Sequence, residues 1–154
     1  MAFDAVKYKA TTRQQWQDAA EAWNAWGRFL ATWLGPATEA MLDMAKVGSG
    51  SIVLDVAAGA GQQTLIAALR AGPSGRVLAT DISPDILDYA QENARIQGLH
   101  NVETLEADGE SLDVAPDSFD AAISRVGLIY SVSYTHLTLP TTCTPCRCRW
   151  WPGE

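Results

Sequence analysis

The sequence has 154 residues, of which 47% are hydrophobic and 19% are charged, and its formal net charge is −7. This length allows one domain with a real core, and the acidic balance argues against a nucleic-acid-binding protein, which needs clustered Lys and Arg. No apolar run approaches the roughly 20 residues that span a bilayer, and the N-terminus has no apolar signal segment, so we expect a cytoplasmic protein.

The first 47 residues predict two helices. Thr11 or Thr12 is expected to cap a helix that runs to about residue 34, because apolar residues recur within it at spacings of three and four. Gly35-Pro36 predicts a break, and residues 37–47 predict a short second helix. The apolar face of the first helix predicts packing against the body of the domain, which is compatible with a lid over a pocket.

Between residues 48 and 131, strand-like and helical segments alternate. The predicted strands are 51–56, 76–80, 101–107 and 119–124, and the predicted helices are 62–71 and 84–97. Ser83 followed by Pro84 is a typical start of the second of these helices. Strands that alternate with helices indicate parallel pairing through right-handed crossovers, hence a doubly wound α/β sheet.

The loop after the first predicted strand is rich in small residues. Residues 53–61 read VLDVAAGAG, and a ligand of such a sheet binds beyond the carboxyl ends of the strands. Ala57, Gly59 and Gly61 have almost no side chain, so a ligand can lie against their backbone. Two kinds of ligand compete here: a dinucleotide with its pyrophosphate, and a cofactor that carries positive charge.

The charge of the loop favours the second kind. A dinucleotide fingerprint requires G-x-G-x-x-G, and the sequence from Gly59 has Thr64 in the third glycine position. Asp55, at the end of the first strand, would repel a pyrophosphate and suit an ammonium or a sulfonium group. An NAD(P)-binding oxidoreductase domain therefore stays as the alternative.

These residues resemble the motifs of class I S-adenosylmethionine-dependent methyltransferases. Residues 55–61, DVAAGAG, are similar to the first motif of the family, with Ala57 where many members have glycine. Asp81 in VLATDIS and Asp108 in LEADGES match the acidic residues that follow the second and third strands. The resemblance covers residues 8–131 and is greatest to the ubiquinone and menaquinone C-methyltransferase group.

The resemblance implies S-adenosylmethionine as the cofactor and a small molecule as the methyl acceptor. It places Asp55 near the methionine ammonium, Asp81 on the ribose hydroxyls and Asp108 near the adenine amino group. The implied cofactor-binding residues are Asp55, Ala57, Gly59, Gly61, Asp81, Ile82, Asp108, Gly109 and Ser124.

Contacts with the acceptor are not assigned to particular residues. Ser124, Arg125 and Tyr130 follow the fourth strand, where this class often places groups that face the substrate. The candidates to close over the donor from the first helix are Tyr8, Trp23, Asn24 and Trp26. No general base is identified, since His100 falls in the turn before the third strand.

The last residues differ in composition from the rest. All three cysteines, Cys143, Cys146 and Cys148, lie here, and with His136 they suggest a non-catalytic, zinc-stapled domain as a further alternative. The spacing C-x-x-C-x-C is short for one tetrahedral centre. VSYTHLTLPT resembles translated sequencing adapter, so we interpret residues 132–154 as a tail that is not native, with a disordered natural tail as the alternative.

The predicted organisation therefore has three parts. Residues 1–47 form an N-terminal helical segment, residues 48–131 form a partial S-adenosylmethionine-binding domain, and residues 132–154 form the tail. The family is built on a Rossmann-like sheet of seven strands, and the sequence predicts the N-terminal four. We therefore expect a truncated methyltransferase that is inactive by itself.

Overall fold

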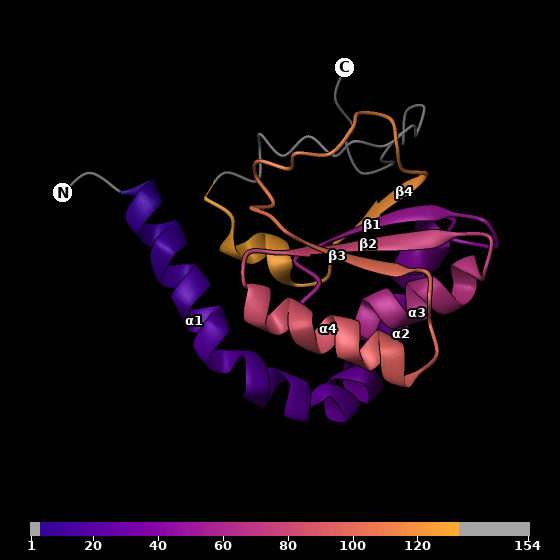
Figure 1. The fold of residues 1–154 in the computed structure, drawn as a ribbon, viewed down its shortest axis with the longest axis horizontal. Helices are drawn as coiled ribbons and strands as arrows, with labels where there is room; N and C mark the ends of the chain where they lie inside the picture. The colour runs from indigo at the N-terminus through magenta and orange to yellow at the C-terminus, as the bar shows by residue number, and fades with distance from the viewer. Residues whose placement is uncertain (1–3, 133–154) are drawn as a thin grey trace, which may run out of the picture.

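Four short apolar segments form one parallel sheet in the computed structural model, which describes residues 4–132 (Figure 1). The strand order is β3-β2-β1-β4, and every neighbouring pair is parallel. The strands are β1 (Ile52–Val56), β2 (Arg76–Asp81), β3 (Val102–Glu106) and β4 (Ala121–Ile123). The predicted sheet and its four strands are confirmed, although β4 is shorter than expected.

The alternation of side chains along β1 gives the two faces of the sheet different partners. Val53 faces α3 (Gln62–Ala71) and α4 (Pro84–Ile96), the crossover helices, which lie on one side of the sheet together with α2 (Gly27–Met44) (Figure 1). Leu54 and Val56 face the segment between β3 and β4 on the other side. The core on the helical side includes Leu42, Val53, Leu65, Val77, Val102 and Ile123.

The two N-terminal helices differ from the prediction. α1 (Ala5–Ala25) begins earlier, because the side chain of Asp4 accepts a hydrogen bond from the Lys7 amide at 3.0 Å and caps the helix. Thr11 lies inside α1 and donates its hydroxyl proton to the Lys7 carbonyl, which lets it sit in a helix interior. The chain turns at Trp26, so the predicted break at Gly35-Pro36 is wrong.

Pro36 lies inside α2, where proline normally disrupts a helix. Thr32 and Pro36 both lie on the exposed side of α2, so water can reach the Thr32 carbonyl that proline leaves without its usual donor. The helix is therefore continuous past the proline. Within residues 4–132, no helix is long and apolar enough to cross a membrane.

α1 packs on α4 and on the loop after β1, and its N-terminal part extends beyond the helices that cover the sheet (Figure 1). Ala20 is buried in a small cluster with Ala60 and Ile86. Asn93 of α4 donates from Nδ2 both to Oδ1 of Asn24, at 2.8 Å, and to the Ala60 carbonyl, at 3.0 Å. One amide thus joins α1, α4 and the loop.

Gly35→Ala tests the continuity of α2. A Cβ at residue 35 meets no atom within 4 Å, so alanine should stabilise an uninterrupted helix by about 0.5–1 kcal/mol. Urea denaturation measures the free energy of unfolding. Gly50→Ala is the matched control, because φ is +84° there and alanine should destabilise the protein. A loss of stability in Gly35→Ala would mean that the helix ends at this residue.

Candidate functional site

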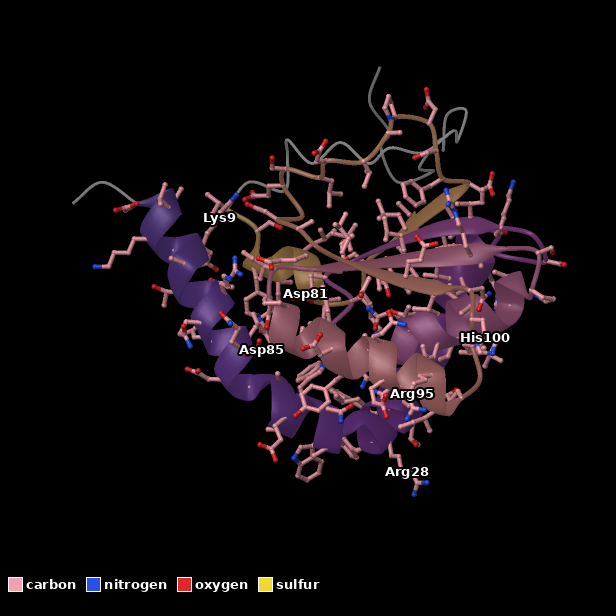
Figure 2. All side chains as sticks on the ribbon, in the orientation of Figure 1. Lys9, Arg28, Asp81, Asp85, Arg95 and His100 are labelled. Atoms are coloured by element: carbon pink, nitrogen blue, oxygen red, sulfur yellow. The ribbon has the colours of Figure 1, made fainter. Side chains whose placement is uncertain are left out.

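A cavity lies between α1 and the segments that follow the four strands. From α1, the residues that line it are Lys9, Thr12, Trp16 and Trp23. Six of the nine predicted cofactor-binding residues also line it: Ala57, Gly59, Asp81, Ile82, Asp108 and Gly109. Figure 2 shows Lys9 and Asp81 toward the same end of the molecule, whereas His100 lies at the opposite end. The parallel strands therefore bring most of the predicted set together.

The glycine loop between β1 and α3 has left-handed backbone at three residues: φ is +56° at Ala57, +59° at Gly59 and +87° at Gly61. A Cβ on Gly59 would lie 3.1 Å from Nε1 of Trp23, which covers the loop from α1. A Cβ on Gly61 would lie 3.1 Å from that of Ala90. Gly61 does not line the cavity, so its small size serves the contact with α4.

Ala57 is an alanine in a conformation that favours glycine. Its methyl group occupies the space that a side chain on Gly127 would need, because a Cβ on Gly127 would overlap it. Gly127 begins a short 3-10 helix, Gly127–Tyr130, directly after β4. The segment after β4 therefore packs against the glycine loop at this pair of residues.

Asp81, at the end of β2, holds the glycine loop from the other side. Its Oδ2 accepts a hydrogen bond from the Gly59 amide at 2.9 Å, and its Oδ1 accepts one from the Ser83 amide at 3.1 Å. Burial raises the pKa of Asp81, and the backbone amides act in the opposite direction. The carboxylate still lines the cavity, so it can accept hydrogen bonds from a ligand hydroxyl.

Asp108, after β3, has a local partner and a distant one. Its Oδ1 accepts a hydrogen bond from the Glu110 amide at 2.9 Å, which closes a tight Asx turn. Its Oδ2 lies 2.5 Å from Nζ of Lys9, which also lies 2.6 Å from Oε2 of Glu110. Farther along α1, Arg13 pairs with Glu106 at 2.5 Å. These ion pairs join α1 to the end of β3 and to the segment that follows it.

Asp55 is fully buried and does not line the cavity. It shares the helical face of the sheet with Val53, so its carboxylate accepts from Nε2 of Gln63 at 3.1 Å and from Oγ1 of Thr64 at 2.6 Å. Burial raises its pKa from 3.8 to about 7, although both hydrogen bonds lower it. Gln63 lines the cavity, so it stands between Asp55 and a ligand. The placement of Asp55 near the methionine ammonium, directly or through water, stays a prediction.

Residues after β4 contribute to the cavity unevenly. Ser124 does not line it, and its buried Oγ has no hydrogen-bond partner among residues 4–132. Arg125 lines it and donates from Nη1 to Oγ1 of Thr38 in α2, at 2.7 Å. The ring of Tyr130 meets that of Trp16 edge-on, with centroids 5.3 Å apart.

Of the residues expected to close over the donor from α1, Trp23 lines the cavity, but the other three do not, and several lining residues were not predicted. Trp26 is 63% exposed and does not line the cavity, and Asn24 is bound to α4. Lys9, Trp16 and Gln63 line the cavity without having been predicted. The spacing of apolar residues identifies the inner face of α1, but it does not show which loop that face meets.

Within residues 4–132, no group of three His, Cys, Asp or Glu side chains is arranged to hold a metal ion. The four ligands of the zinc hypothesis, His136, Cys143, Cys146 and Cys148, lie outside the described residues. The predicted non-native tail, residues 132–154, lies outside the described residues from residue 133 onward, so this interpretation stays a prediction.

A family model for the methyltransferase domain matches residues 53–139, which include the glycine loop and both strand-end aspartates. The chain belongs to the methyltransferase domain family. The predicted resemblance is therefore confirmed, and the dinucleotide oxidoreductase alternative has no support.

The methyltransferase domain has similar sequences and structures in other organisms. An uncharacterized Mycobacterium tuberculosis protein is 37% identical over 98 residues, which are 64% of this chain and 34% of that protein. The ubiquinone/menaquinone biosynthesis C-methyltransferase of Klebsiella pneumoniae is 35% identical over 88 residues, 56% of this chain and 35% of that enzyme. The chain thus spans about a third of the length of these two relatives.

A solved S-adenosylmethionine-dependent methyltransferase from Aquifex aeolicus has the same fold. It superposes with a TM-score of 0.52 at 29% identity, and the match covers 56% of this chain and 46% of that one.

Gly127→Ala tests the contact between the glycine loop and the segment after β4. The new methyl group would overlap that of Ala57, so we expect a loss of about 1–3 kcal/mol in the free energy of unfolding, measured by urea denaturation. Ala57→Gly removes the opposing methyl group and relaxes a left-handed residue, so the double variant should recover most of the loss. If Gly127→Ala cost the same free energy of unfolding whether residue 57 is alanine or glycine, the two residues would not be in contact.

The raised pKa of Asp55 predicts a pH-dependent stability. The folded state keeps a proton that the unfolded chain has released, so the contribution of this group to stability falls as pH rises from 3.8 to about 7. Asp55→Asn cannot ionise, so between about pH 5 and about pH 8 the wild type should lose on the order of 1–3 kcal/mol relative to the variant. Urea denaturation at several pH values measures both proteins, and a difference independent of pH would refute the assignment.

Proposed function

We propose that this chain binds S-adenosylmethionine in the cavity under α1, and that the protein transfers the methyl group to a small molecule. The observation that carries the proposal is the convergence of the glycine loop with the two strand-end aspartates. Gly59, Asp81 and Asp108 come from three successive strand ends and line one cavity. Membership of the methyltransferase family and the likeness to the Aquifex aeolicus enzyme support the same assignment.

The residues of the cavity fit the parts of this cofactor. A ribose offers two hydroxyl donors, and Asp81 is a carboxylate acceptor that lines the cavity. The adenine amino group can donate a hydrogen bond to the carboxylate of Asp108. Ile82 and Gly109 line the same cavity. Trp23 lies over the glycine loop and limits the access of water to that region.

The chemistry demands little from the protein beyond binding. When bound, S-adenosylmethionine supplies a methyl group that is already activated on a sulfonium. The residues of the chain therefore serve to orient the donor and to keep water from it. A general base is needed only where the acceptor must lose a proton, and no side chain of the cavity is assigned that role.

The net charge of the chain supports one class of methyl acceptor over another. The formal net charge of −7 opposes binding to nucleic acid, so we propose a small-molecule acceptor. A cytoplasmic location is part of the same proposal. The ubiquinone/menaquinone enzyme that the chain resembles makes a carbon acceptor a reasonable first compound class to assay.

Calorimetric titration of the 154-residue chain tests the donor site. We expect saturable binding of S-adenosylmethionine and of S-adenosylhomocysteine, and no binding of NAD. Asp81→Asn should weaken the binding of both by about tenfold or more, because it replaces a charged acceptor of the ribose hydroxyls. Asp85→Asn is the matched control, since Asp85 is an exposed aspartate four residues away that does not line the cavity. Binding of NAD in preference to the methyl donor would refute the proposed function.

A further inference from the structure

Arg125 is a half-buried cation that contacts no carboxylate among the described residues, although the buried Asp55 acts on it electrostatically without an ion pair. Among the described residues, the other half-buried cationic side chains are paired with carboxylates: Lys9 with Asp108, Arg13 with Glu106 and Arg70 with Asp43. Arg125 makes no such ion pair in residues 4–132. A partly desolvated charge without an ion pair destabilises a protein, so a bound anionic group would stabilise this position.

The hydrogen bonds of Arg125 lead to the same conclusion. A guanidinium has five N–H donors, and the structure supplies an acceptor for one of them, at Oγ1 of Thr38. Its Nε is buried and has no acceptor within the described part of the chain. Burial lowers the pKa of Arg125, but a guanidinium stays charged at every physiological pH. The unused donors match the planar, bidentate geometry of a carboxylate.

The position of Arg125 is set by rigid contacts. Thr38, which holds one end of the guanidinium, is fully buried in α2. Val126 has a φ of +71°, a strained conformation for a β-branched residue, and strain of this kind gathers at binding sites. Gly127 packs against Ala57, so the arginine is fixed beside the glycine loop.

Side chains of both charges line the cavity. Asp81 and Asp108 line the part that fits the adenosine portion of the donor. Lys9 and Arg125 are the cations among the described lining residues, and Lys9 is neutralised by Asp108 and Glu110. Of these two cations, Arg125 is therefore the one without a contacting carboxylate, and it is free to bind an anionic group.

We propose that Arg125 binds the carboxylate of the amino-acid portion of S-adenosylmethionine. This inference rests on the proposed function. The amino-acid portion is a zwitterion, and Gln63, which is bonded to Asp55, lines the same cavity and offers a carbonyl oxygen for the ammonium group. Arg125 thus supplies a cation for the carboxylate, and Gln63 supplies a carbonyl acceptor for the ammonium group of one zwitterion.

A pair of donors that differ in one group tests the proposal. Decarboxylated S-adenosylmethionine keeps the sulfonium and the ammonium and lacks only the carboxylate. In calorimetric titrations, the wild type should bind S-adenosylmethionine about 10- to 100-fold more tightly than the decarboxylated compound. Arg125→Gln should remove most of this difference by weakening S-adenosylmethionine alone. Arg95→Gln is the matched control, because Arg95 is exposed and pairs with Glu92.

The outcomes distinguish a failure of the proposal for Arg125 from a failure of the proposed function. An unchanged ratio of the two affinities in Arg125→Gln would overturn the proposal and assign the arginine to an anion on the methyl acceptor. If Arg125→Gln does not fold, the wild type still decides, since equal affinities for the two compounds would also overturn the proposal. A folded wild type that binds neither compound would instead refute the proposed function itself.

Discussion

The carboxylate of Asp81 joins the parts on which the cavity depends. One oxygen accepts from the Gly59 amide and the other from the Ser83 amide, so a single side chain links β2, the glycine loop and the start of α4. Three residues of that loop have left-handed backbone, which loses its support if the amides lose their acceptors. The Ala58 amide donates to the Thr80 carbonyl and adds a second hydrogen bond between the glycine loop and β2. The floor of the cavity is thus built from backbone and held by one buried acid.

The sheet and the strand-end acids were predictable because they follow from short-range rules. Apolar runs of strand length between helical segments specify parallel pairing, and parallel pairing places every carboxyl end at one edge. Asp81 and Asp108 therefore meet at one cavity although 27 residues separate them in the sequence. The cap at Ser83, whose side chain accepts from the Ile86 amide, was predictable for the same local reason.

Features that depend on tertiary packing were not predictable. The period of two along β1 shows that Asp55 shares a face with Val53, but it does not show that the helices cover that face, so the carboxylate was expected at the ligand. Pro36 is a strong breaking signal, yet the exposed side of α2 tolerates it. The path of α1 depends on long-range contacts, among them Asn24 with Asn93 and Lys9 with Asp108.

The shared space between residues 57 and 127 has an evolutionary consequence. One methyl group fits there, and in this chain it belongs to Ala57, so residue 127 must be glycine. A homologue with glycine in the position of Ala57 is released from that requirement and has room for a side chain in the position of Gly127. The two positions lie 70 residues apart in the sequence, yet they should covary across the family.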